Sequence, residues 1–340
     1  MQVLVTGGTG FVGSHVAAVL LGAGHGVRVL TRRPEVLGSV MAAHDVTVDD
    51  VAVGDMADPA AVAAALDGCD AVVHAAAQIG VSGGTDSSPE ANVEGVRQVV
   101  GQAVDRGCDP ILYTSSSAVH LPTDADVIRP DTPLAEPLSV YGRSKVEGER
   151  LVQAWQAEGA PIATFVLGGV YGPDSPHTEA SAGALLSVLT SMSVETDGGV
   201  TIIDVRDVAA ALTAALAPGR GPHRYLAGGT FLTWAEYGEL LGRVTGRELH
   251  HHRMSAEEMI AMGRDLDRRR EEGHQIDVPL SEESAVIMTA GRPTDDRVTW
   301  DDLGVRPRPV EETLRDAVRS LIDQGHLDPA MAPALGDPTG

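Results

Sequence analysis

A glycine-rich turn near the amino terminus, Thr6-Gly7-Gly8-Thr9-Gly10-Phe11-Val12-Gly13, constrains the fold of this chain more than any other feature. The apolar run Val3 to Val5 before the turn is typical of a buried parallel strand, and apolar residues after it recur at helical spacing. Strand, glycine turn and helix together are the context of a phosphate-binding loop, in which the helix N-terminus faces a diphosphate. Three glycines alone also fit an ordinary strand-to-helix turn, so the assignment depends on the rest of the chain.

The rest of the pattern predicts an α/β fold built on a doubly wound parallel Rossmann sheet, because strands and helices alternate over the first 170 residues. Strands are predicted at residues 3–5, 27–31, 51–55, 70–73, 111–113 and 162–167, and after Pro173 a strand at 202–205 with a helix at 206–216. We expect an NAD(P)-binding domain over residues 1–173, with 200–222 returning to it, a smaller mixed substrate-binding part over 174–199 and 223–327, and a flexible tail over 328–340. Capping boxes are predicted at Thr233 with Glu236 and at Ser255 with Glu258.

Composition narrows the partners and the location of the protein. The formal net charge of −23 over 340 residues argues against nucleic acid or an anionic membrane surface as a partner. Cys69 and Cys108 are the only cysteines, so there is no disulfide framework. No leader precedes the first strand and no apolar run is long enough to span a bilayer, so we expect a cytoplasmic protein. His250 to His252 point in alternate directions on an extended segment and would chelate poorly, so no metal site is expected.

The end of the second predicted strand indicates the type of dinucleotide. An acidic side chain usually stands there and accepts from the ribose 2′-hydroxyl of NAD, whereas this chain has Thr31, Arg32 and Arg33. A guanidinium can hold a 2′-phosphate through paired hydrogen bonds. The sequence therefore favours NADP, with NAD as the alternative, although the two arginines also fit a solvated strand end.

A serine, a tyrosine and a lysine form the predicted catalytic set. Tyr141 and Lys145 are four residues apart on a predicted helix and share one face, and the serine cluster that includes Ser116 follows the strand at 111–113. An ammonium roughly 5 Å from a phenol lowers its pKa of about 10 by about two units. We therefore expect Tyr141 to act as the acid–base, Ser116 to hold the substrate oxygen, and Lys145 to tune Tyr141 and bind the nicotinamide ribose. His74 is expected to be a packed histidine at a strand end.

These motifs together resemble those of the extended short-chain dehydrogenase/reductases, the NAD(P)-dependent epimerase/dehydratase family. The matching segments are the glycine turn, Gly54-Asp55, His74-Ala75-Ala76-Ala77, Thr114-Ser115-Ser116, Tyr141-Gly142-Arg143-Ser144-Lys145, Tyr171-Gly172-Pro173 and Asp204-Val205-Arg206-Asp207-Val208-Ala209. The resemblance implies that Ser116 is the catalytic serine, with Ser115 as its nearest rival. It places Asp55 beside the adenine and Asn92 near the nicotinamide side, and it implies a homodimer built through the helices that contain Asn92 and Tyr141. The full set of expected cofactor contacts is Gly7, Thr9, Gly10, Phe11, Val12, Gly13, Arg32, Asp55, Met56, Ala75, Ala76, Ala77, Asn92, Thr114, Tyr141, Lys145, Leu167, Gly168 and Val170.

One departure from the family pattern bears on the substrate. Many members carry Arg-Pro before the Tyr-Gly-Pro segment, and sugar-nucleotide epimerases often have an asparagine there, whereas this chain has Val166-Leu167-Gly168-Gly169. The apolar edge is more similar to the dihydroflavonol reductase and 3β-hydroxysteroid dehydrogenase branches. We expect an NADP(H)-dependent oxidoreductase that transfers hydride between nicotinamide and a small, largely apolar carbonyl or secondary alcohol. The alternatives are a redox-neutral sugar-nucleotide epimerase or dehydratase with retained NAD(P), and, ranked last, a non-catalytic dinucleotide sensor.

Overall fold

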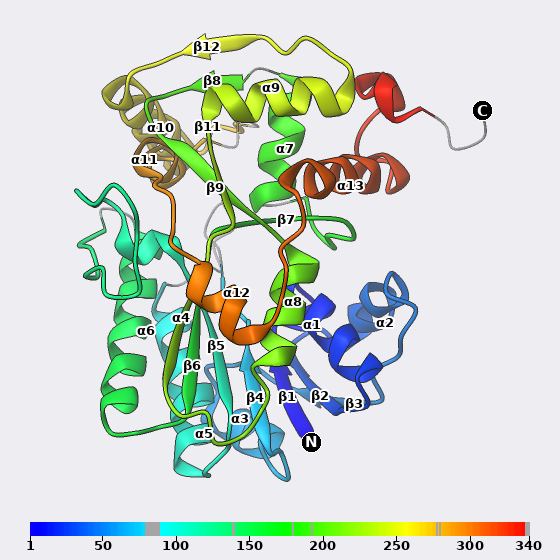
Figure 1. The fold of residues 1–340 in the computed structure, drawn as a ribbon, viewed down its shortest axis with the longest axis vertical. Helices are drawn as coiled ribbons and strands as arrows, with labels where there is room; N and C mark the ends of the chain where they lie inside the picture. Colours follow the sequence, from blue (N-terminus) through cyan, green and yellow to red (C-terminus); the bar gives the residue numbers. More distant parts are fainter. Residues whose placement is uncertain are drawn as a thin grey trace.

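The largest element is a parallel sheet of seven strands in the order β10-β6-β5-β4-β1-β2-β3 (Figure 1). The computed structural model describes residues 1–78, 89–137, 140–178, 180–191, 193–276, 278 and 280–336. The strands are β1 (Gln2–Thr6), β2 (Gly26–Thr31), β3 (Asp50–Val53), β4 (Ala71–His74), β5 (Ile111–Ser116), β6 (Ile162–Leu167) and β10 (His223–Ala227). The strand order reverses between β1 and β4, as in doubly wound dinucleotide-binding sheets, where ligands bind at the carboxyl ends beside the reversal. The predicted fold class is confirmed.

Helices cover both faces of this sheet. They are α1 (Phe11–Gly22), α2 (Pro34–Ala42), α3 (Pro59–Ala65), α4 (Pro89–Val96), which continues through the π-helical turn η1 (Arg97–Gly101) into α5 (Gln102–Asp105), α6 (Val140–Ala157) and α8 (Val205–Ala214). Val3 and Val5 pack in a core with α1 and α8, while Leu4 between them packs in a second core on the opposite face. Burial on both faces explains why the strands read as continuous apolar runs.

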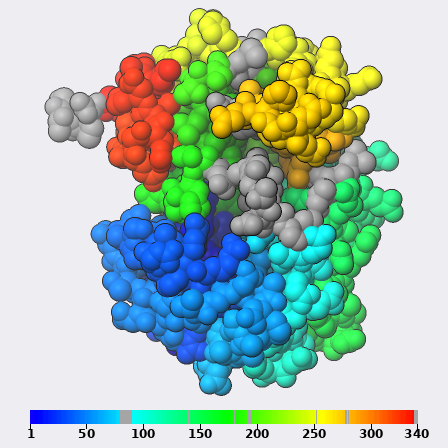
Figure 2. Space-filling model, turned by 180° about the vertical axis from the view of Figure 1, so that it is seen from behind, coloured from blue at the N-terminus to red at the C-terminus, as the bar shows by residue number. Residues whose placement is uncertain are grey.

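The smaller part lies over the carboxyl ends of the large sheet (Figure 1). It holds the sheet β11-β9-β7 and the pair β12-β8, with β7 (Gly169–Tyr171), β8 (Ser193–Glu195), β9 (Gly199–Asp204), β11 (Thr230–Thr233) and β12 (His251–Arg253). Its helices are α7 (Ala180–Thr190), α9 (Trp234–Thr245), α10 (Ala256–Glu271), α11 (Glu282–Ala290) and α13 (Val310–Asp323), whereas α12 (Arg297–Leu303) packs against β10 and α8 of the large sheet. Both predicted capping boxes, at the start of α9 and α10, are present. From behind, the blue and cyan residues form the lower half of the molecule and the yellow and red residues the upper half (Figure 2).

Two expected boundaries differ from the structure. Residues 223–227, assigned from the sequence to the substrate-binding part, form β10, which pairs in parallel with β6 and so covers backbone groups that would otherwise be an unpaired edge. Residues 199–204 form β9 in the smaller sheet, so the return to the large sheet begins with α8, which packs on α1.

The expected tail forms short turns that are anchored at Ala332. Residues 329–331 and 333–335 form the short turns η3 (Pro329–Met331) and η4 (Pro333–Leu335). Ala332 between them is 2% exposed, and η4 contacts α9. Residues 337–340 lie outside the described residues. Within the part of the chain that the structure describes, no helix is both long and apolar enough to cross a membrane.

Candidate active site

The glycine turn forms a close-packed backbone cradle at the end of β1. Gly7 has φ of 76°, in the left-handed region, and the Gly10 N–H donates to the Gly7 carbonyl at 2.8 Å. A Cβ on Gly7 would lie 2.8 Å from the Ala76 nitrogen, and one on Gly13 would lie 2.2 Å from the Gly7 oxygen. Only glycine fits at these two positions, and among the described residues no side chain caps the first turn of α1. The cradle fits a dinucleotide diphosphate, because the N–H groups at this helix end are left for an anion.

The adenosine end of the expected site carries an exposed ion pair. The Arg32 guanidinium follows β2 and lies 3.4 Å from Oδ2 of Asp55, which follows β3. The other oxygen of Asp55 accepts from the Ala57 N–H at 2.8 Å. Exposed pairs of this kind contribute at most about 1 kcal/mol, so a phosphate could replace Asp55 as the partner of Arg32 at little cost. Met56 packs its sulfur against α4, where a Cβ on Gly95 would lie 2.8 Å from it.

Ser116, Tyr141 and Lys145 come together at the ends of β5 and α6. The Tyr141 hydroxyl lies close enough to Ser116 for the serine to lower its pKa, and Lys145 Nζ lies 5.8 Å from the centroid of the Tyr141 ring. Ser116 is paired in register with Leu167 of β6, so an aliphatic side chain stands beside the serine. Of the two candidate serines, Ser115 is buried, at 4% exposed, and Ser116 is the one that lies close to the Tyr141 hydroxyl.

The electrostatics of the set differ in part from the expectation. Burial lowers the pKa of Lys145 to about 8, although Glu149 on the next turn of α6 opposes this shift. Burial also raises the pKa of Tyr141, the Glu283 carboxylate of α11 raises it further, and the nearby Ser116 hydroxyl lowers it. The sequence argument expected Lys145 to lower this pKa, but burial and Glu283 outweigh such an effect here. No sequence signal pointed to Glu283, which comes from a helix about 140 residues beyond Tyr141.

One sequence signal for the lysine was missed: Lys145 is the only lysine among the 25 basic residues of the chain, and all the others are arginines. An arginine stays charged at any accessible pH, whereas an amine can be shifted by burial into the physiological range. A single lysine at this position therefore favours the expected role of Lys145 as a titratable amine.

Several residues singled out from the sequence form hydrogen bonds with other groups of the protein. His74 is 1% exposed, its Nδ1 lies 2.8 Å from Thr6 Oγ1, and burial lowers its pKa to about 3, so the packed strand-end histidine is confirmed. Thr114 Oγ1 donates to the His74 carbonyl at 3.2 Å. Asn92 accepts from the Gln78 N–H at 2.7 Å and donates to the Gln78 carbonyl at 3.0 Å, so it fixes the chain that follows β4. Its contact with a cofactor stays a prediction.

The remaining predicted residues follow the strand ends. Ala75 and Ala76 lie against Gly7, as the glycine contacts above show, and Ala77 follows them. Leu167 is 6% exposed, the Gly168 N–H donates to the Ala227 carbonyl at 3.1 Å, and Val170 lies in β7 opposite Ile203. Phe11 and Val12 begin α1, with Val12 partly buried in the core, and Thr9 lies in the turn before them. Residues 79–88, which follow β4 in the sequence, and residues 138 and 139, which precede α6, lie outside the described residues.

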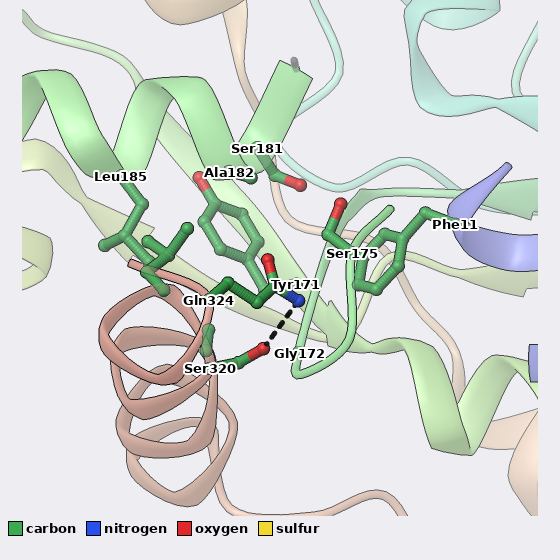
Figure 3. Close-up of a pocket in the computed structure, with 11 residues that line it drawn as sticks. Phe11, Tyr171, Gly172, Ser175, Ser181, Ala182, Leu185, Ser320 and Gln324 are labelled. Carbon is green, nitrogen blue, oxygen red and sulfur yellow. Dashed lines mark hydrogen bonds between the residues drawn. The ribbon is translucent and has the colours of Figure 1, made fainter. Parts of the chain in front are cut away.

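A small cavity lies between the glycine turn and the smaller part. Its wall combines Phe11 at the start of α1, Tyr171 and Ser175 after β6, and side chains of α7 and α13 (Figure 3). Gln324 Nε2 donates to Ser320 Oγ at 3.3 Å in this wall. A second cavity, of about 540 Å³, lies between the 127–129 loop, β9 and the 293–297 segment. Neither cavity is lined by Ser116, Tyr141 or Lys145.

A doubly wound sheet with this glycine cradle and this serine–tyrosine–lysine set defines a dinucleotide-binding fold of the short-chain dehydrogenase type. The chain belongs to the NAD-dependent epimerase/dehydratase family, whose model matches residues 3–228. The resemblance stated from the sequence is thereby confirmed, and the family is one of enzymes that bind NAD(P).

Relatives within this family carry several activities. The chain is 35% identical over 183 residues to a 3 beta-hydroxysteroid dehydrogenase/Delta 5-->4-isomerase of Mycobacterium tuberculosis, with 50% of this chain and 47% of that protein covered. It is 35% identical over 173 residues to a 2-alkyl-3-oxoalkanoate reductase of Stenotrophomonas maltophilia, with 49% of each covered. Both matches span about half the length of these curated relatives. A UDP-glucose-4-epimerase structure from Stenotrophomonas maltophila has a TM-score of 0.76 at 21% identity, covering 96% of this chain and 99% of the other, and shares the fold.

Proposed function

We propose that the protein is an NADP(H)-dependent oxidoreductase that interconverts a small, largely apolar carbonyl compound and its secondary alcohol. The observation that carries the proposal is the convergence of Ser116 and the Tyr141 hydroxyl, with Lys145 Nζ 5.8 Å from the centroid of the tyrosine ring. Bound NADP(H) would supply or accept the hydride. The names of the two curated relatives, a hydroxysteroid dehydrogenase and an oxoalkanoate reductase, support an apolar substrate.

The roles of the three side chains follow from their positions. Two neighbouring hydroxyls can both donate to one carbonyl oxygen, so Ser116 would orient the oxygen and Tyr141 would deliver the proton. The raised pKa of Tyr141 keeps the phenol protonated at neutral pH, which is the form that carbonyl reduction requires. Leu167 beside Ser116 suits an apolar group next to the reacting carbon.

The direct test follows nicotinamide absorbance when purified protein meets NADPH or NADH with a panel of aryl, aliphatic and steroid ketones and aldehydes. We expect stoichiometric consumption of NADPH with at least one substrate class. No consumption across the panel, with dinucleotide still bound after purification, would contradict a reductase and support the redox-neutral sugar-nucleotide activity.

Exchange of Arg32 for serine should change the choice of cofactor. Removing a charge-assisted contact of about 1.5–3 kcal/mol lowers kcat/KM for NADPH by roughly 10-fold to 150-fold and leaves the value for NADH nearly unchanged. Arg319→Ser, which removes an equally exposed arginine from α13, is the matched control. Equal losses with both dinucleotides, or none, would contradict the assignment of Arg32 to the 2′-phosphate.

The pH dependence should follow Lys145. Since its pKa is about 8, the ammonium is present below that pH and is lost as the pH rises through it. We expect kcat/KM for carbonyl reduction to be level from about pH 6 to 7.5 and to fall above about pH 8. Protein made with 13C-labelled lysine gives a single Cε resonance because the chain has one lysine, and its titration reports this pKa directly. A resonance that titrates near 10.5 would show that the site does not depress the pKa.

A further inference from the structure

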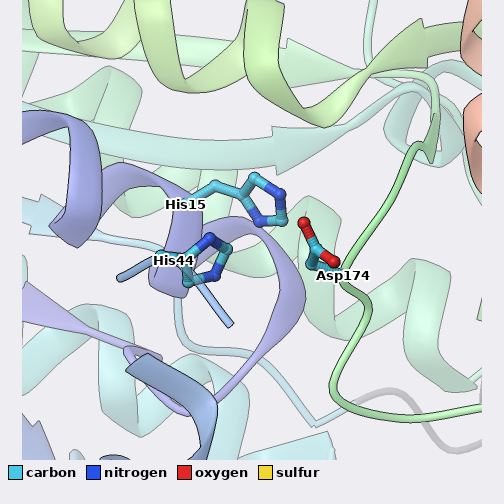
Figure 4. Close-up of side chains that lie close together, drawn as sticks. All are labelled: His15, His44 and Asp174. Carbon is cyan, nitrogen blue, oxygen red and sulfur yellow. The ribbon is translucent and has the colours of Figure 1, made fainter. Parts of the chain in front are cut away.

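Two histidines and an aspartate from three separate segments converge beside α1. His15 lies on α1, His44 follows α2, and Asp174 lies in the segment that follows β7. One potential ligand atom from each lies within 4.8 Å of the other two. Figure 4 shows the Asp174 carboxylate pointing toward the pair of imidazole rings. Such a group is outside the glycine turn and the catalytic set, and nothing in the proposed reaction uses it.

The hydrogen bonding of the two histidines leaves ligand atoms turned toward this cluster. His15 Nδ1 lies 2.9 Å from the Phe11 carbonyl oxygen, which can only accept, so Nδ1 carries the proton and Nε2 keeps its lone pair. A backbone carbonyl in this role is the usual outer partner of a metal-binding imidazole. His44 Nε2 is buried and has no hydrogen-bond partner among the described residues, which is uncommon for a buried nitrogen.

The position of Asp174 is fixed by its backbone. Its φ of 58° is left-handed, and its N–H donates to Ser320 Oγ of α13 at 2.8 Å. Arg206, whose charge acts on Asp174, is already paired with Asp204 at 2.7 Å and Asp316 at 2.8 Å, so its charge is compensated. Asp174 therefore provides the carboxylate that a cation would meet beside two neutral imidazoles.

We infer that His15, His44 and Asp174 bind one divalent transition-metal ion of the zinc class. Two imidazole nitrogens and one carboxylate oxygen are common zinc ligands, at about 2.0–2.2 Å from the ion. Tetrahedral donors at such bond lengths lie about 3.3 Å apart, so side-chain movements of about 1 Å close the site from its present spacing. His44 and Asp174 are only partly buried, so water can reach the fourth position.

The ion would connect the two parts of the molecule. His15 and His44 belong to the dinucleotide-binding part, whereas Asp174 lies where the chain leaves β7 for the smaller part. Tyr171 and Ser175 on either side of Asp174 line the cavity that includes Phe11 of the glycine turn. A bound metal would hold this segment against α1.

Titration of the tag-free full-length chain with Zn²⁺ tests the site. Calorimetry should show one equivalent per chain at this site, and Zn²⁺ should raise the Tm by about 3 °C or more. His44→Gln and Asp174→Asn should each weaken this binding at least roughly 10-fold and remove the rise in Tm. Co²⁺ bound at the site should give a visible absorption band that both variants lose.

The matched control is the triple variant His250→Gln/His251→Gln/His252→Gln. It removes the three consecutive histidines at the start of β12 and should still bind one equivalent of Zn²⁺. Circular dichroism in EDTA checks that each variant is folded, and if His44→Gln is not, the near-isosteric Asp174→Asn decides. The inference is overturned if the wild type binds no Zn²⁺, if both single variants bind it like the wild type, or if binding is lost in the triple variant alone.

Discussion

Replacement of Tyr141 by phenylalanine should lower kcat by about 10³-fold, since the variant has no proton to deliver to the substrate oxygen. The substitution removes only the hydroxyl that lies close to Ser116 and leaves the ring in place. We therefore expect dinucleotide affinity to change by less than about threefold. Initial rates of NADPH consumption and fluorescence titration with NADPH measure the two quantities separately.

Tyr113→Phe provides a matched control for this prediction. Tyr113 lies on β5, is 1% exposed, and has its ring centroid 6.0 Å from Lys145 Nζ, so it presents a second phenol near the same ammonium. Loss of its hydroxyl should change kcat only a few-fold. A Tyr141→Phe enzyme that keeps more than about a tenth of its activity, or equal losses in both variants, would contradict the role of Tyr141.

Replacement of Lys145 by methionine should abolish turnover and yet stabilise the cofactor-free protein. A lysine whose folded pKa is depressed from 10.5 to about 8 weakens folding while it is charged, and two to three pKa units correspond to roughly 3 kcal/mol at neutral pH. The unfolded chain binds more protons between pH 8 and 10.5, so this penalty declines as the pH rises through that window. We expect a Tm about 5 °C above the wild type at pH 7.

The same two proteins compared near pH 10.5 provide the control, because the wild-type lysine is then neutral and the difference in Tm should disappear. A variant less stable than the wild type at pH 7 would show that the attraction of Lys145 to Glu149 outweighs its burial. Glu149 itself is held by Arg224 of β10 at 2.7 Å, so it does not depend on Lys145 for a partner.

The parts of the fold that the sequence predicts are those set by neighbouring residues. The glycine turn, the first six strands of the large sheet and both capping boxes depend on residues close in the chain, and all appear at or near the predicted positions. The grouping of the serine, tyrosine and lysine could be predicted from the sequence because a parallel sheet aligns the end of β5 with the ends of its neighbours.

The features that the sequence did not predict depend on distant segments. Residues 223–227 were not recognised as a strand because the pattern His-Arg-Tyr-Leu-Ala is short and half polar, and only the open edge of β6 makes it one. Glu283 reaches Tyr141 from α11, and Asp174 reaches His15 and His44 across more than 100 residues of sequence. No local spacing encodes such contacts. The choice of NADP, the substrate and the expected homodimer stay predictions for the experiments above.

The late position of β10 in the chain has a consequence for how the protein can be made. A ribosome releases the glycine turn, Ser116, Tyr141 and Lys145 within the first 173 residues, but β10 and the covering helix α8 are synthesised only afterwards. Until residue 227 has emerged, the nascent sheet has an open edge at β6 and an uncovered apolar face on α1. A fragment that ends at residue 173 therefore contains every proposed catalytic residue but not the complete large sheet. Chimaeras between relatives need to keep residues 205–227 with the amino-terminal segment.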